Sequence, residues 1–233
     1  MSWAAFPATP VWFVLVVALA GGAVGEVLRR RLATGGYRLD DETGPPPRVP
    51  VTVVPVVLAL LWGLIAWRFG PLSEWALAPA YLGLGAVAVA LTWIDADVHR
   101  LPRGLTRPAY PLLVVQLAIA SAASGDWGAL WRALVVGAVL WLVYALLALV
   151  AALLGSGFGL GDVTLAGLVG LSTGYLGVSA TLVATYAAFL LSAAYGLSRI
   201  ALRRGGRKDD IAFGPWMLLG LLLALVVAVR PLF

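Results

Sequence analysis

Long apolar runs separated by short basic clusters constrain this chain more than any other feature of its sequence. Apolar residues fill 62% of the 233 positions and charged residues only 12%, whereas a soluble domain carries about 25% charged residues. So few charges cannot cover the surface of a soluble protein. The sequence therefore excludes a soluble enzyme, a disordered protein and a free nucleic-acid-binding domain, and it is typical of a membrane protein with several spans.

The apolar runs predict the number of helices. A helix needs about 20 apolar residues to cross the hydrocarbon core of a bilayer. We therefore predict an all-α membrane bundle of about eight transmembrane helices, with residues 1–233 forming one transmembrane domain. The predicted spans are residues 10–28, 51–67, 77–94, 109–124, 129–154, 163–174, 176–200 and 214–230. The break at Gly174–Gly177 separates the sixth span from the seventh, and without it the chain has seven spans.

The basic residues predict the orientation. With eight spans, 13 of the 16 basic residues lie in or beside the four connections on one side, at 29–50, 95–108, 155–162 and 201–213. Positive residues resist translocation, so this side is predicted to be cytoplasmic and both termini to be external. With seven spans, the basic connection 201–213 would lie on the external side, where positive residues are disfavoured. The orientation therefore favours the break at Gly174–Gly177. The longest connection, 29–50, is rich in acidic residues and proline, which predicts an exposed, irregular linker.

Three of the eleven acidic residues are functional candidates. Seven others lie in predicted loops, and Glu26 lies near the end of the first span, where an interfacial position or an arginine partner is expected. Asp95, Asp97 and Asp162 lie where a cytoplasmic connection meets a span. An ionisable group at such a place is costly to bury and is a functional candidate by default. The alternative is that they are polar loop ends, with Asp162 a helix N-cap.

A pair of aspartates suggests acid–base chemistry. Two carboxylates that are brought together share one proton, because both cannot ionise easily. One can then act as a base on water while the other donates a proton to a carbonyl oxygen. The chain has no cysteine, and its single histidine, His99, has no evident partner. Neither a metal nor a cofactor is implied.

Alternating glycines precede Asp162, at positions 155, 157, 159 and 161. Glycine allows close backbone approach, so this loop is a candidate for contact with a substrate backbone. A plain flexible turn is the alternative. The spacing does not fit a G-x-G-x-x-G nucleotide fingerprint, and no alternation of strands and helices surrounds it.

Three motifs resemble those of one family. Ile94-Asp95, Leu101-Pro102 and Leu105-Thr106 resemble the I-D-x5-L-P-x2-L-T stretch of prepilin peptidases. The segment 158–162, Phe-Gly-Leu-Gly-Asp, resembles their F-G-x-G-D motif, and 212–215, Ala-Phe-Gly-Pro, is similar to their P-F-G-P element. The motifs occur in the family's order and cover about residues 80–220.

The resemblance implies a GxGD-type membrane aspartic protease in the bacterial inner membrane. Such enzymes remove the basic leader of type IV prepilins and pseudopilins on the cytoplasmic side, so the implied partners are a prepilin-like precursor and the lipid bilayer, without nucleic acid. The implied catalytic pair is Asp95 and Asp162, with Asp97 auxiliary. The remaining implied site residues are the active-site loop Phe158, Gly159 and Gly161 and the supporting motif residues Leu101, Pro102, Phe213, Gly214 and Pro215.

The sequence also departs from the family pattern. The cysteine-free connection 29–50 stands where many members carry a cysteine-rich, zinc-binding domain that accompanies N-methylation, which predicts a peptidase without methyltransferase activity. Thr164 replaces a frequent lysine, and Arg103 replaces a common Asp or Asn. Two alternatives stay open: a catalytically inactive pilus-assembly protein, and a small proton- or cation-coupled transporter, against which the clustering of the acids at one interface argues.

Overall fold

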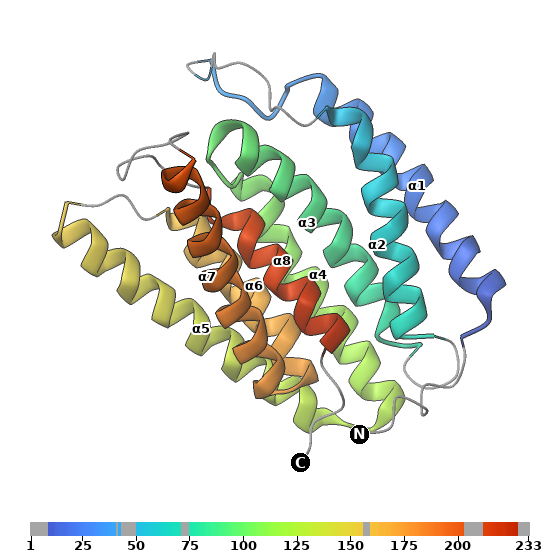
Figure 1. Ribbon diagram of the computed structural model, residues 1–233. Helices are drawn as coiled ribbons and strands as arrows, with labels where there is room; N and C mark the ends of the chain where they lie inside the picture. Colours follow the sequence, from blue (N-terminus) through green and yellow to red (C-terminus); the bar gives the residue numbers. More distant parts are fainter. Residues whose placement is uncertain are drawn as a thin grey trace. The chain divides into compact units, whose positions relative to one another are not determined.

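All regular secondary structure in the described residues is helical. The structure is a computed structural model in which residues 9–40, 42, 50–70, 75–155, 159–202 and 212–227 are described. These residues form no strand, and a short 3-10 turn, Val51–Val53, leads into the second α-helix. The α-helices are α1 (Val11–Ala33), α2 (Val54–Arg68), α3 (Ala78–Val98), α4 (Arg103–Ser124), α5 (Trp127–Leu153), α6 (Leu160–Leu176), α7 (Val178–Ala201) and α8 (Gly214–Val227) (Figure 1). The predicted all-α fold is confirmed.

Each predicted span corresponds to one of these helices. Five stretches are long and apolar enough to cross a membrane, namely α1, the stretch Val51–Arg68 that contains α2, α3, α5 and α7. The helices α6 and α8 are apolar but shorter, and α4 begins with a segment that carries two arginines and two prolines. Large apolar side chains are exposed on α1 and α5, among them Leu19 and Trp131, which suits contact with lipid. The chain is an integral membrane protein.

The break between the sixth and seventh helices lies at Gly177. This residue has φ 140° and ψ 157°, and it separates α6 from α7. Only glycine adopts this region of backbone space without strain. The prediction of a break within Gly174–Gly177 is therefore confirmed.

The helix ends at two of the predicted connections differ from the prediction. The helix α1 continues to Ala33, and α3 continues to Val98, where His99 with φ 50° ends it. The predicted connection 95–108 is therefore wrong, because only residues 99–102 separate α3 from α4. Hydropathy marks where the apolar part of a helix stops, whereas charged residues such as Arg and Glu are compatible with further helical turns. In α1, Glu26 accepts hydrogen bonds from Arg29 and Arg30 at 2.6 and 2.9 Å, so the expected arginine partner is confirmed.

The chain divides into two compact units. The first contains residues 1–98 and 108–125, and the second contains residues 99–107 and 126–233. In the first unit α1 packs closely on α2, because a Cβ at Gly21 would come within 2.8 Å of Trp62 and one at Gly25 within 2.6 Å of Pro55. Glycines four residues apart allow such close approach of two membrane helices.

The second unit is organised around α6. Nearly every residue from Val163 to Tyr175 is buried, and α6 contacts α5, α7 and α8. Gly170 and Gly174 let α5 approach, because a Cβ at these positions would lie 2.9 Å from the Val136 carbonyl oxygen and 2.7 Å from the Val136 Cβ. The guanidinium of Arg132 on α5 donates to the last carbonyl groups of α6 at 2.9 and 2.8 Å. It thereby satisfies carbonyl groups that a helix end leaves without a partner.

Candidate functional site

Asp95 lies on the buried side of the last turn of α3. Its exposed fraction is 5%, and Leu84, Leu91 and Ile94 of the same helix are also buried. Asp97 follows two residues later, which is roughly 200° further around an α-helix. It shares a face with Trp93, four residues earlier. The two aspartates of this turn therefore point in different directions.

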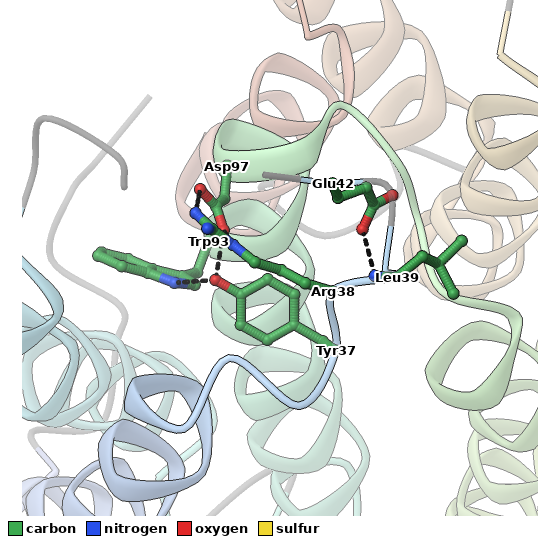
Figure 2. A network of polar contacts seen from close by, with 6 residues as sticks. All are labelled: Tyr37, Arg38, Leu39, Glu42, Trp93 and Asp97. Carbon is green, nitrogen blue, oxygen red and sulfur yellow. Dashed lines mark hydrogen bonds and ion pairs between the residues drawn. The ribbon is translucent and has the colours of Figure 1, made fainter. Parts of the chain in front are cut away.

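Asp97 binds two residues of the connection that follows α1 (Figure 2). The guanidinium of Arg38 donates from Nε to Oδ2 at 2.7 Å and from Nη2 to Oδ1 at 2.5 Å, and the Tyr37 hydroxyl donates to Oδ2 at 2.5 Å. The indole nitrogen of Trp93 donates to the Tyr37 oxygen at 3.3 Å. The Asp97 side chain is fully inaccessible and that of Arg38 is 25% exposed. Both oxygens of Asp97 are thus engaged by the protein itself.

The electrostatics of this cluster favour a neutral tyrosine and a charged arginine. Burial and then the hydrogen bond to Asp97 raise the pKa of Tyr37 above its usual 10.0. The same carboxylate raises the pKa of Arg38. The sequence does not single out either residue, because Arg38 is one of several arginines in the basic connections and Tyr37 belongs to no motif. The expected irregular linker 29–50 is therefore, at Tyr37 and Arg38, a segment bound to α3.

Asp162 lies in the first turn of α6. The N-cap of this helix is Gly159, so the N-cap role considered for Asp162 is wrong. The Asp162 carboxylate folds back toward the cap, because its Oδ2 lies 3.2 Å from where a Cβ of Gly159 would be. A negative charge in the first turn is stabilised by the amino-terminal end of the helix dipole.

Gly161 joins two of the sequence motifs. A Cβ at Gly161 would lie 2.8 Å from the Cβ of Leu101 and 3.2 Å from its Cγ and Cδ1. Leu101 is only 7% exposed, and the Pro102 carbonyl after it accepts the backbone N–H of Leu105 at 3.0 Å. The structure thus brings the Leu-Pro motif against the glycine beside Asp162. Phe158 lies outside the described residues.

The third motif begins α8 in the same unit. Gly214 is the first residue of the helix, and Pro215 follows it, where the first turn of a helix tolerates proline. The Phe213 ring lies 5.2 Å from that of Phe189 and 6.4 Å from that of Tyr144, measured between centroids. Phe213 therefore lies next to aromatic side chains of α5 and α7.

The departures from the family pattern have simple local environments. Thr164 donates from its hydroxyl to the Leu160 carbonyl oxygen at 3.2 Å. Arg103, the first residue of α4, is exposed, and so is His99. The two aspartates expected to form the pair belong to different units, with Asp95 in the first and Asp162 in the second.

Comparison with known proteins gives one informative match. Over 168 residues the chain is 31% identical to a protein of Neisseria gonorrhoeae named prepilin leader peptidase/N-methyltransferase. The chain is a distant homologue of that protein. The matched region covers 70% of this chain, and the chain spans about half of the relative's length, 52%. This homology supports the resemblance to prepilin peptidases. No protein-family profile and no solved structure matches the chain.

Proposed function

We propose that the chain is a membrane aspartic endopeptidase that removes the basic N-terminal leader from type IV prepilin-like or pseudopilin precursors. The observation that carries the proposal is the packing of Gly161 on Leu101. This contact joins the glycine-aspartate motif to the Leu-Pro motif that follows Asp95 in the chain. The homology to the prepilin leader peptidase/N-methyltransferase of Neisseria gonorrhoeae points to the same activity.

Asp95 and Asp162 are the proposed catalytic pair. One carboxylate removes a proton from water, and the water oxygen attacks the scissile carbonyl carbon. The other aspartate, in its protonated form, donates its proton to the carbonyl oxygen. When the tetrahedral intermediate collapses, the C–N bond breaks and the leaving amine takes the proton that the first carboxylate removed from water. A hydroxyl of the intermediate returns a proton to the second carboxylate, which restores the starting pair. The burial of Asp95 and the helix dipole at Asp162 give the two carboxyl groups different environments, as this division of roles requires.

The substrate is recognised in two parts. We propose that the lysine- and arginine-rich leader lies in the cytoplasm, among acidic side chains and lipid headgroups, while the apolar pilin helix lies in the bilayer. The scissile bond then falls at the cytoplasmic interface, near the cytoplasmic ends of α3 and α6 in the predicted orientation. The relative's name includes N-methyltransferase, but we propose the peptidase activity alone, because the connection 29–50 contains no cysteine.

Leader cleavage of a co-expressed prepilin tests the proposal. Asp95→Asn and Asp162→Asn should each reduce cleavage by about 100- to 10,000-fold, the contribution typical of general acid–base catalysis. Asp126→Asn is the matched control, because Asp126 caps α5 through a hydrogen bond from the Ala129 N–H and asparagine caps a helix equally well.

The outcome separates the competing functions. Cleavage that survives both single substitutions would refute the aspartate mechanism. A wild-type chain that supports pilus assembly without cleaving the leader would identify the inactive assembly protein instead. Ion or proton flux by the protein reconstituted in vesicles, without cleavage, would identify a transporter.

A further inference from the structure

The last turn of α3 carries two carboxylates at an unfavourable place. Asp95 and Asp97 lie near the carboxyl end of the helix, where the helix dipole destabilises negative charge, and the last turn contains no basic residue. A cation from outside the helix offsets the charge of Asp97. Arg38 supplies it through two parallel hydrogen bonds to Asp97, the arrangement that gives an arginine–carboxylate pair its strength and its fixed geometry.

We propose that Tyr37, Arg38 and Asp97 form a clamp that positions Asp95, so that Asp97 serves to hold the connection after α1 on α3 and takes no part in the chemistry. This inference rests on the proposed peptidase function. All three are positioning residues. The clamp fixes the final turn of α3 from the face that carries Trp93 and Asp97, while Asp95 lies on the buried face of the same turn.

The contacts account for this division of roles. A carboxylate that acts on water must offer an oxygen to that water, but both oxygens of Asp97 accept hydrogen bonds from Tyr37 and Arg38, and its side chain is inaccessible. Helix ends fray when nothing holds them. Tyr37 and Arg38, about 60 residues away in sequence, hold Asp97 at the end of α3 (Figure 2). In the clamp these contacts suppress fraying and so fix the rotation of the turn that also carries Asp95.

Kinetic measurements on purified protein with a prepilin substrate test the clamp. Arg38→Gln and Asp97→Asn should each lower kcat by about tenfold to a hundredfold, the loss expected when a catalytic group is misplaced by about 1 Å. The KM should change little, because the clamp acts on the position of Asp95 and not on substrate binding. The double variant should lose no more than the worse single variant, since both changes break one interaction. Arg38→Lys, which keeps the charge but has no paired donors, should recover part of the lost activity.

The matched control is Arg31→Gln, because Arg31 is exposed near the end of α1 and the clamp consists of Tyr37, Arg38 and Asp97. Loss of kcat in Asp97→Asn with normal activity in Arg38→Gln would overturn the proposal, because Asp97 would then be a catalytic group. A raised KM with unchanged kcat in both variants would also overturn it, because the pair would then bind the leader.

A second measurement does not depend on peptidase activity. The chain has no cysteine, so a spin label at Leu39→Cys, an exposed position beside Arg38, reports only on this segment. The clamp predicts a slow-moving label in the wild-type background and in Arg31→Gln, and a fast-moving label in Asp97→Asn. Equal mobility in all three would overturn the clamp even if the protein cleaves prepilin. An immobile label in a protein without cleavage activity would instead reject the peptidase function and leave the clamp standing.

Discussion

Replacing Gly161 by alanine tests whether the packing of α6 on Leu101 positions Asp162. A Cβ at residue 161 would lie 2.8 Å from the Leu101 Cβ, whereas non-bonded carbon atoms prefer about 3.5–4.0 Å. The two segments must therefore separate by about 0.7–1.2 Å. Overpacking of this kind costs about 1–3 kcal/mol, and the higher helix propensity of alanine returns at most about 1 kcal/mol.

The expected result is a large loss of activity with a small loss of stability. Because Asp162 is the next residue, the same movement displaces its carboxylate, and a displacement of about 1 Å costs up to about 100-fold in rate. Leader cleavage by Gly161→Ala should therefore fall about 10- to 100-fold. The matched control is Gly104→Ala, because a Cβ there meets no atom within 4 Å. Wild-type cleavage rates for Gly161→Ala, or an equal loss in the control, would refute the reasoning.

Three further predictions concern stability in detergent. Arg132→Met removes two hydrogen bonds to the last carbonyl groups of α6 and should lower the free energy of unfolding by about 1.5–3 kcal/mol; an unchanged melting curve would contradict this. Gly177→Ala forces a side chain into a region open only to glycine and should cost about 1–3 kcal/mol in the same assay, unlike Val178→Ala beside it. The raised pKa of Tyr37 means that the folded state holds the phenolic proton more tightly, so its stabilisation is complete below about pH 10 and is lost as the pH rises through the folded pKa. Tyr37→Phe should remove that part of the alkaline loss, and identical stability-against-pH curves would speak against it.

The number and order of the described helices could be predicted from the sequence because the apolar runs are long and because polar or glycine-rich segments separate them. Gly177 illustrates this, since a glycine-rich break is readable in sequence and its backbone conformation explains it. The helix ends could not be predicted from the same signal. Arg29–Arg31 and Asp95–Val98 are too polar for the membrane interior but fully compatible with a helix, so the helices continue beyond the apolar runs.

The motif residues of the candidate site could be named from the sequence, whereas the residues that pack against them could not. The glycine-rich loop before Asp162 is a candidate for contact with a substrate backbone, but nothing in the sequence indicates that Gly161 packs on Leu101, 60 positions earlier. The Arg38–Asp97 pair likewise joins residues 59 positions apart. In sequence, Arg38 cannot be told apart from the other arginines of the basic connections. Only the tertiary structure shows that it is the partner of the buried Asp97 carboxylate.

Cross-linking of residues 95 and 162 tests the central claim most directly, since it asks whether the two aspartates share one site. The native chain is free of cysteine, so Asp95→Cys/Asp162→Cys carries the only two thiols available to a short bis-maleimide. The matched control is Asp97→Cys/Asp162→Cys, because Asp97 lies on another face of the same helical turn. A shared catalytic site predicts efficient cross-linking of the 95–162 pair in membranes and little of the 97–162 pair. No 95–162 cross-link, or equal yields from both pairs, would contradict a shared catalytic site.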